Sequence, residues 1–235
     1  GVGEHLVLPG QKSAAKDAKP APMRPRAQLD IIRPDGTLAQ PQFGNTGRYR
    51  STFDVQLDQK GTWKLAIANQ GLFARYEEKG EMRRWSGKAA DFAKHVPKNA
   101  EKLQVTDNST RMEVFVTSGE PTEQVFKPTG QGLELSPKTH PNDLFAGETA
   151  DFVFLLDGKP ARNVKVKVIP ANGQDLDELN DIKLKTDKNG AVSITWPDAG
   201  MYWLEATRSQ SVKDSNSPAT QKRASYTATL EVLAP

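Results

Sequence analysis

The sequence predicts an all-β protein that is built from two consecutive antiparallel β-sandwich domains. Apolar and polar residues alternate in many short runs, among them residues 63–67, 152–156 and 192–196. Alternation with a period of two is typical of strands that bury one face. Turn residues such as Gly, Pro, Asn and Asp separate these runs at intervals of roughly ten residues, which is the spacing of strands in a sandwich.

The first domain is expected to span residues 27–132. Residues 88–96 contain several Ala and Phe side chains and are expected to form a short helix that ends before Pro97. Residues 119–132 are expected to connect the two domains. The strands of this domain are expected at residues 29–31, 53–57, 63–67 and 112–116, with a hairpin that joins residues 72–76 to residues 81–85.

The second domain is expected to span residues 133–235. Residues 209–222 are expected to form an exposed loop, and the strand after it is expected to close the sheet. The strands are expected at residues 152–156, 164–168, 182–184, 192–196, 202–204 and 226–232. Residues 1–26 precede both domains and are expected to be an extended segment, because Lys, Ala and Pro dominate much of their sequence.

Composition excludes several classes of function. The chain has 32 basic and 29 acidic side chains, and a net charge of +3 does not create the field that nucleic-acid binding needs. The absence of cysteine excludes disulfides, thiolate metal sites and cysteine nucleophiles. No apolar run reaches the roughly 18 residues of a membrane-spanning helix, so direct membrane insertion is not expected. The chain starts with Gly1, and we expect a mature form whose export signal has been removed.

Catalytic motifs are absent from the sequence. It contains no G-x-S-x-G nucleophile elbow and no phosphate-binding P-loop. The run Gly130-Gln131-Gly132 lacks the third glycine of a dinucleotide-binding loop. We therefore expect a protein that is not an enzyme.

Three histidines are the candidate ligands for a transition metal. His140 and Asp143 lie three residues apart in a turn that contains Pro141, and such a pair can converge on one ion. The same two residues can equally be turn residues with satisfied polar groups. His5 is the third candidate ligand and would arrive from the N-terminal segment. His95 is expected at the end of the short helix, where a structural role is favoured over metal binding.

Aromatic and basic side chains alternate in the expected hairpin. Nearby carboxylates at Glu77, Glu78 and Glu81 are expected to neutralise the basic residues, which favours simple cross-strand packing. A sugar-stacking surface is the alternative, and it requires Tyr76 and Trp85 to be exposed side by side. The interleaved residues are Phe73, Arg75, Tyr76, Arg83, Arg84 and Trp85.

Several longer motifs carry a resemblance to a known family. They are the runs at residues 47–53, 69–73, 84–87, 127–135, 139–144 and 196–203, which read GRYRSTF, NQGLF, RWSG, KPTGQGLEL, THPNDL and WPDAGMYW. Together they resemble an uncharacterised bacterial envelope family whose members are described as periplasmic components of nickel- or cobalt-type uptake systems. The resemblance covers the chain from about Leu29 to its C-terminus.

The resemblance implies export to the periplasm and a C-terminal sandwich similar to immunoglobulin-like or transthyretin-like modules. It also implies nickel or cobalt as ligand and membrane transporter components as partners. Members of the family tend to begin with a His-containing W-L-x-P segment and continue to a D-H-x-P-M-like motif. This chain has His5-Leu6-Val7-Leu8-Pro9 without the Trp, and no His precedes Pro22-Met23, so most of those histidines are missing.

Two hypotheses of function follow. The leading one is a non-catalytic periplasmic binding or accessory protein for metal uptake, with His140, Asp143 and His5 as ligands. The alternative is an envelope interaction or scaffold module that binds a partner protein or a polysaccharide through Tyr76 and Trp85.

Overall fold

The computed structural model describes residues 27–46, 51–171, 181–213 and 216–235, and nearly all of its regular structure is β-strand. The helical elements within these ranges are the short helix α1 (Phe92–His95) and two 3-10 turns at Ala89–Asp91 and Gln124–Phe126. No helix in the described part of the chain is both long and apolar enough to cross a bilayer. The prediction of an all-β sandwich is confirmed.

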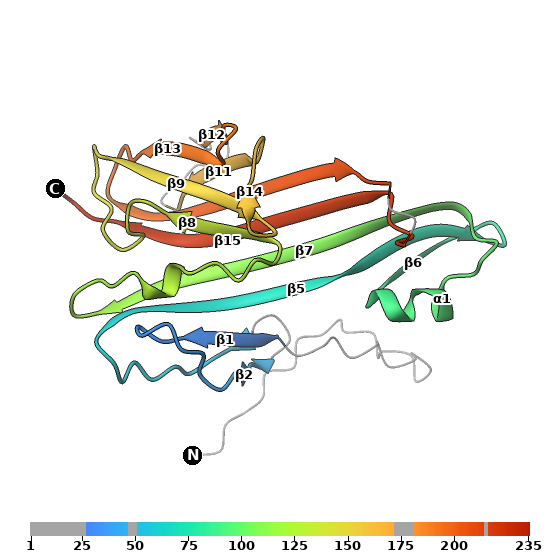
Figure 1. The fold of residues 1–235 in the computed structure, drawn as a ribbon, viewed down its shortest axis with the longest axis horizontal. Coiled ribbons are helices and arrows are strands. Elements are labelled where there is room, and N and C mark those ends of the chain that lie inside the picture. The colour runs from blue at the N-terminus through green and yellow to red at the C-terminus, as the bar shows by residue number, and fades with distance from the viewer. Residues whose placement is uncertain (1–26, 47–50, 172–180, 214–215) are drawn as a thin grey trace, which may run out of the picture.

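One large sheet runs the length of the molecule (Figure 1). Its nine strands include two of 18 residues each, β5 and β7, which extend far beyond the others. In spatial order the strands are β12 (Ile182–Lys185), β11 (Lys165–Pro170), β14 (Gly200–Ser211), β15 (Gln221–Val232), β7 (Glu101–Ser118), β5 (Gly61–Glu78), β1 (Gln28–Ile32) and β2 (Gln42–Phe43), with β6 (Glu81–Gly87) paired to β5.

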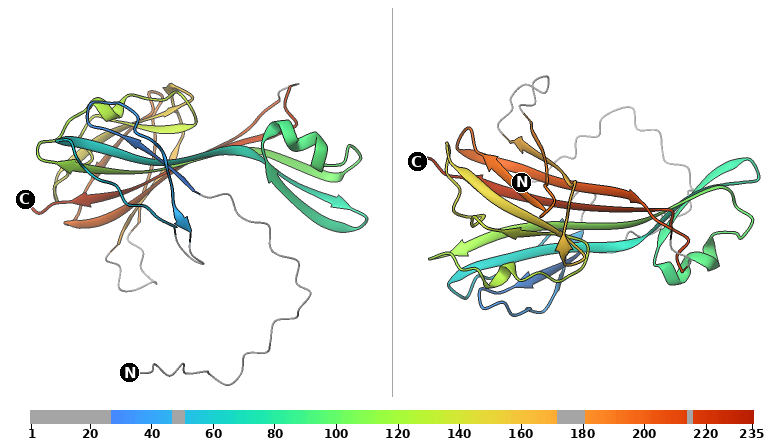
Figure 2. Two further views of the ribbon diagram at one scale, coloured as in Figure 1. Left: turned by 90° about the horizontal axis from the view of Figure 1, so that it is seen from below. Right: turned by 45° about the horizontal axis from the view of Figure 1, so that its top comes forward.

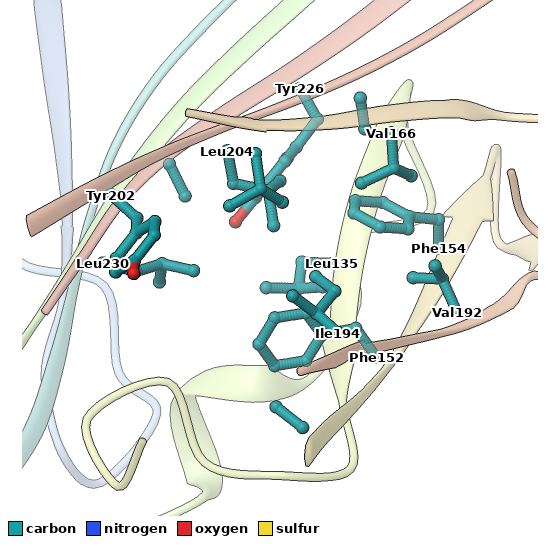
Figure 3. Close-up of a cluster of buried hydrophobic side chains, with 14 of the residues drawn as sticks. Leu135, Phe152, Phe154, Val166, Val192, Ile194, Tyr202, Leu204, Tyr226 and Leu230 are labelled. Carbon is teal, nitrogen blue, oxygen red and sulfur yellow. The ribbon is translucent and has the colours of Figure 1, made fainter. Parts of the chain in front are cut away.

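A smaller sheet covers one face of the large sheet and completes the sandwich. The close-up in Figure 3 shows Phe152 and Phe154 pointing into the space between the sheets, where the Phe154 ring meets Tyr226 edge-on at 5.7 Å. The strands of this sheet are β8 (Leu133–Pro137), β9 (Thr149–Leu156), β10 (Lys159–Pro160) and β13 (Ala191–Thr195). A separate two-stranded ribbon pairs β3 (Asn45–Thr46) with β4 (Ser51–Thr52).

A buried tyrosine supports the immunoglobulin-like character of the second half. The Tyr202 hydroxyl donates a 2.8 Å hydrogen bond to the carbonyl of Asp198, four residues earlier in the chain. Its ring lies 5.1 Å from the fully buried ring of Trp196. A tyrosine that bonds back to the upstream backbone beside a buried tryptophan is typical of immunoglobulin-like sandwiches.

The large sheet is continuous because β15 pairs with β7 in parallel, in register from Gln221 and Thr106 to Thr229 and Val114. All other strand pairs in the described chain are antiparallel. The expectation that the last strand closes the sheet is wrong, because β15 has β14 on one side and β7 on the other. The division into two domains at residues 132 and 133 stays a prediction, and one sheet runs through both parts.

The loop before β15 is shorter than the sequence suggested. The expected loop at residues 209–222 loses residues at both ends, because β14 continues to Ser211 and β15 begins at Gln221. The two strands pair along their whole length, from Gly200 with Val232 to Ser211 with Gln221. Polar side chains alone did not reveal this extension, since strands exposed on one face tolerate them readily.

The far ends of β5 and β7 form a tip with a core of its own (Figure 2). The hairpin predicted for residues 72–76 and 81–85 is confirmed, and β5 turns into β6 at Lys79 and Gly80, whose φ angles are 53° and 78°. Two successive positive φ angles match the tight turns that favour right-twisted hairpins. The core of the tip contains Leu72, Ala74, Tyr76, Val96, Val105 and Ala219.

Register assigns every residue of the large sheet to one of two faces, because successive side chains of a strand point in opposite directions. The inner face, which carries Leu72, Glu113 and Tyr226, packs against the small sheet and the core of the tip. The outer face carries Phe73, Met112 and Trp203, which all remain exposed.

Residues 53–58 cover part of the outer face near β1. They were expected to be a strand, but in the structure they form no ladder. Phe53 and Val55 nevertheless pack against the buried side chains of Leu29, Ile31 and Trp63. The alternating pattern therefore predicted correctly that Phe53 and Val55 face the core, although Leu57 is exposed and residues 53–58 have no neighbouring strand.

A cluster of four charged side chains lies buried between the inner face and β8. Arg111 contacts Glu113 at 3.3 Å and Glu134 at 3.8 Å, and the amine of Lys64 lies 4.0 Å from Glu113. The hydroxyl of Tyr226 donates a 2.9 Å hydrogen bond to Glu113. Two cations and two carboxylates balance, which lowers the cost of removing them from water.

Glu134 is held further by the chain that precedes it. Its carboxylate accepts hydrogen bonds from the backbone N–H groups of Thr129 and Gly130 at 2.9 and 2.8 Å. The Thr129 hydroxyl donates a third bond to it at 2.8 Å. The cluster thereby fastens the connector at residues 119–132 to both sheets.

Replacement of Tyr226 by phenylalanine tests the cluster. We expect Tyr226→Phe to lower the free energy of unfolding at neutral pH by about 1.5–3 kcal/mol, because Glu113 would lose a donor in a buried site. Urea unfolding measures this loss. The control is Tyr202→Phe. The wild-type Tyr202 hydroxyl bonds only to the backbone of Asp198, and we expect its loss to lower the free energy of unfolding by about 1 kcal/mol.

The variant Tyr226→Phe also tests the titration of the Tyr226 phenol. Burial, together with the charge of Glu113 and the hydrogen bond to it, raises the pKa of Tyr226 well above the usual value of 10.0. Its contribution to stability is therefore complete below about pH 10 and declines at higher pH, where only the unfolded chain releases the proton. We expect the difference between wild type and Tyr226→Phe to shrink above about pH 10. A difference that stays constant there would contradict the assignment.

Candidate polysaccharide-binding groove on the outer face

A groove of about 800 Å³ crosses the outer face at the base of the tip. It is formed by β5, β6 and β7 together with the ends of β14 and β15 nearest the tip. The lining residues come from strands that neighbour one another in the large sheet, so their spacing is fixed by the ladder. They are Asn69, Gln70, Gly71, Leu72, Phe73, Ser86, Gly87, Lys88, Thr106, Asn108, Thr110, Ser209, Gln221 and Arg223.

One residue that lines the groove is a glycine that permits the backbones of β5 and β6 to approach closely. Gly71 lies on the outer face, between Asn108 on β7 and the start of the tip. A Cβ atom at this position would lie 2.8 Å from the carbonyl oxygen of Gly87, which is closer than real Cβ contacts. No larger residue therefore fits at position 71 without movement of the backbone.

Amide and hydroxyl side chains dominate the lining. Within the described part of the chain, none of these amides and hydroxyls has a hydrogen-bond partner in the protein. They are therefore free to bond to a ligand, and amides and hydroxyls can each donate and accept. The residues concerned, all on the outer face by register, are Asn69, Ser86, Thr106, Asn108, Thr110, Ser209 and Gln221.

Two exposed aromatic rings share this face. Phe73 lines the groove and is 42% exposed, and Trp203 on β14 is 40% exposed. Phe73 pairs with Thr106 of β7, which in turn pairs with Gln221 of β15. Trp203 pairs with Thr229, which lies further along β15. Eight residues along β15 separate the two levels, which corresponds to about 25 Å at the usual rise of a strand.

Tyr76 and Trp85, the ligand-binding residues expected from the sequence, point to the other side of the sheet. Tyr76 is only 7% exposed and belongs to the core of the tip. Trp85 stacks on His95 with ring centres 5.9 Å apart and meets Phe92 edge-on at 5.7 Å. The two aromatic residues therefore do not form an exposed pair, and their packing agrees with the cross-strand interpretation that the sequence favoured.

His140 has hydrogen bonds at both ring nitrogens. Its Nδ1 accepts a bond from the backbone N–H of Asn142 at 3.0 Å, so this nitrogen carries no proton. The proton of the neutral ring is then on Nε2, which lies 3.1 Å from the carbonyl of Thr122 and 3.0 Å from the hydroxyl of Thr62. In this arrangement the ring has no lone pair to offer to a metal.

The bonds of His140 belong to a larger polar network. The Thr62 hydroxyl lies 2.8 Å from that of Thr117, which donates to the side-chain oxygen of Asn142 at 2.9 Å. The side-chain amide of Asn142 donates to the carbonyl of Phe115. The network joins β5, β7 and the turn at residues 139–143, and it gives His140 a structural role.

The other predicted metal ligands do not converge with His140. Asp143 is exposed, and its backbone N–H bonds to the carbonyl of His140. His5 lies outside the described residues. The structure brings no three potential His, Cys, Asp or Glu ligands together within its described ranges. The ring of His95 is occupied by a 3.0 Å hydrogen bond from Nδ1 to the carbonyl of Asp91.

The fold and the groove define a β-sandwich protein with an open, polar sheet face. The family model described as a domain of unknown function, DUF4198, matches residues 7–210, and the chain belongs to this family. The search of curated proteins gave no match.

Solved structures with some likeness come from Escherichia coli. Trypsin-activated α2-macroglobulin is 15% identical with a TM-score of 0.22, and the match covers 88% of this chain and 13% of that one. The α2-macroglobulin activated by porcine elastase is 13% identical with a TM-score of 0.19, and the match covers 87% of this chain and 28% of that one. The chain thus spans only a small part of either protein.

Sequence reasoning found part of the groove and missed the rest. Phe73 was noticed within the aromatic and basic hairpin, but its partners Thr106, Asn108 and Gln221 were not. The available signal was the run of alternating polar residues at residues 104–110, which reads QVTDNST and is typical of a strand with a solvated face.

Replacement of His140 tests its structural role. We expect His140→Ala to lower the free energy of unfolding by about 1–3 kcal/mol, because a backbone N–H and a carbonyl lose their partner. Chemical denaturation measures the change. The matched control is His95→Ala, which removes an exposed ring and should cost less than about 1 kcal/mol. Equal effects of the two substitutions would contradict the role of the network.

Proposed function

We propose that the protein is a non-catalytic binding module of the bacterial cell envelope that holds a polysaccharide in the outer-face groove. The observation that carries this proposal is the row of amide and hydroxyl side chains with no partner inside the described protein. A polysaccharide presents hydroxyl groups along its length, and each of them can donate and accept a hydrogen bond. The chemistry of the groove is complementary to this pattern.

The composition of the groove favours a polysaccharide over a partner protein. The core of a protein interface is usually apolar and rich in large aromatic side chains. This groove has one exposed aromatic, Phe73, and its remaining surface is mostly polar. An exposed ring beside hydrogen-bonding groups can pack against the C–H face of a sugar while the neighbours bond to its hydroxyls.

The support beneath the groove is rigid. Its side chains stand on strands that pair continuously, with β5 and β7 matched from Gly61 and Ser118 to Arg75 and Gln104. Side chains that are already placed lose little freedom on binding, so weak individual contacts can add up to useful affinity. The groove can thus bind an extended chain without a conformational change.

The groove is expected to bind without cleaving. Glycoside hydrolysis usually requires two carboxyl groups that flank the bond to be broken. Among the residues that the structure describes, no Asp, Glu or His lines the groove. A location in the periplasm is part of the proposal, and the resemblance to envelope proteins supports it.

Replacement of Phe73 tests the proposal. We expect the protein to bind members of a panel of purified bacterial capsular and cell-wall polysaccharides, and Phe73→Ala to weaken binding about tenfold, which corresponds to about 1.4 kcal/mol. Asn108→Ala should weaken it about fivefold, through the loss of one hydrogen bond. Affinity electrophoresis in gels that contain each polysaccharide measures both effects.

The matched control for Phe73 is Phe43→Ala, which removes an exposed phenylalanine on β2, away from the groove. Its affinity should equal that of wild type. The absence of binding to every polysaccharide in the panel, or equal losses for the two phenylalanine variants, would refute the proposal.

Uptake of nickel or cobalt is the function that the resemblance implies, and it predicts a different result. The hydrogen bonds of His140 argue against a site at this residue. We therefore expect no heat when Ni²⁺ or Co²⁺ is titrated into the full chain by isothermal calorimetry. Binding in wild type that is lost in His140→Ala but retained in His95→Ala would favour metal transport instead.

A further inference from the structure

Four basic side chains surround the groove on the outer face of the tip. Lys88 and Arg223 line the groove itself. Arg75 and Arg84 are paired in the β5–β6 ladder, next to the pair of Phe73 and Ser86 on the same face. The side chains of all four basic residues are exposed. None of the four has a hydrogen bond or ion pair within the described residues.

The pairing of Arg75 with Arg84 is unfavourable for the isolated protein. The two residues are directly opposite in the β5–β6 ladder, and like charges in this position destabilise a sheet. A carboxylate on a neighbouring strand would relieve the repulsion, but no carboxylate of the described ranges is within an ion-pair distance of either guanidinium. The unpaired charges are therefore free to meet an anion from outside.

The nearby carboxylates are occupied elsewhere. Glu78 and Glu81 both contact Arg83, whose guanidinium lies 2.8 Å from Glu81 and 3.9 Å from Glu78. Glu77 bonds to Lys102. The expectation that these three residues neutralise the basic residues of the hairpin therefore holds only for Arg83, because Glu78 and Glu81 pair with Arg83 and Glu77 pairs with Lys102. Arg75 and Arg84 have no ion pair among the described residues.

Glu101, opposite Glu77 in the ladder, is an exposed acidic residue of the tip, but it does not line the groove. Among the described residues, no acidic side chain lines it. Glu205 on β14 shares the outer face, but it lies four residues from Ser209 and at the end of the face away from the tip. From strand spacing and rise, Arg75 and Arg223 are on the order of 15 Å apart, which is a span of several sugar units.

We infer that the polysaccharide bound in this groove is acidic, with carboxylate groups carried on repeating sugars. The inference rests on the proposed function and adds the charge of the ligand to it. The guanidinium groups of Arg75, Arg84 and Arg223 bind carboxylates in a bidentate manner, and Lys88 supplies a fourth cation. The amides and hydroxyls between them bind the sugar hydroxyls, and Phe73 packs against a ring.

Polymers that differ only in charge provide the test. The intact protein is titrated with polygalacturonate, alginate and hyaluronate and with the methyl-esterified form of each. We expect at least one acidic polymer to bind about tenfold more tightly than its ester at low salt. The preference should weaken at physiological salt, because exposed charges are screened.

Charge-removing variants identify the residues responsible. We expect the double variant Arg75→Gln/Arg84→Gln to lose about tenfold in affinity for the acidic polymer and to retain its affinity for the ester. Arg83→Gln is the matched control, since it removes the same charge from the neighbouring position but from a side chain that is already paired. It should change the affinity by less than about twofold.

A stability measurement keeps the test independent of folding. Because Arg75 and Arg84 repel each other, the double variant should melt at a temperature equal to or higher than that of wild type. A lower melting temperature together with lost affinity would contradict the inference, because the two arginines would then be structural.

The remaining outcomes separate the two proposals. Equal affinity for acidic and esterified polymers, still reduced by Phe73→Ala, would overturn the acidic ligand and leave the polysaccharide groove standing. The absence of binding to any polysaccharide, charged or neutral, would overturn both. Equally tight binding of single-stranded DNA would also overturn the inference, because it would indicate a general surface for polyanions.

Discussion

The parallel pairing of β7 with β15 is the contact on which the rest of this structure depends. It joins strands whose paired residues are separated by more than a hundred positions in the sequence. Without it, the first half would end at β7 and the second at β15, and each would have a long, unpaired edge. Exposed edges of this length invite aggregation, so their mutual pairing both stabilises the sheet and protects it.

The two faces of the joined sheet differ, because the inner face is buried and part of the outer face is exposed. Its inner face is buried by the small sheet and by the tip, and it contains the balanced cluster of Lys64, Arg111, Glu113 and Glu134. Among the described residues, its outer face is covered near β1, and the base of the tip is left open by them. The rigid, buried side thus fixes the positions of the side chains that we assign to ligand binding on the other.

The sequence identified most strands and the hairpin correctly because alternation of apolar and polar residues reports burial directly. The same pattern failed at residues 53–58, where Phe53 and Val55 are partly buried but no strand lies beside them. It also failed for the candidate ligands, since Tyr76 and Trp85 fill the tip and His140 completes a polar network. Residue type alone does not reveal whether a polar or aromatic group is already satisfied.

The sequence by itself determined that the protein is all-β, where most of its turns lie and which residues alternate along each strand, because these properties depend on neighbours along the chain. It did not determine which face of a strand is buried, since Met112 and Val114 are exposed on β7 whereas Glu113 and Phe115 are buried. Tertiary structure alone decided that β15 joins β7, that Glu78 and Glu81 pair with Arg83, and that Arg75 and Arg84 have no ion pair with any other described residue. Those outcomes depend on strand order and register, which bring distant residues together. A single sequence does not encode them in any local pattern.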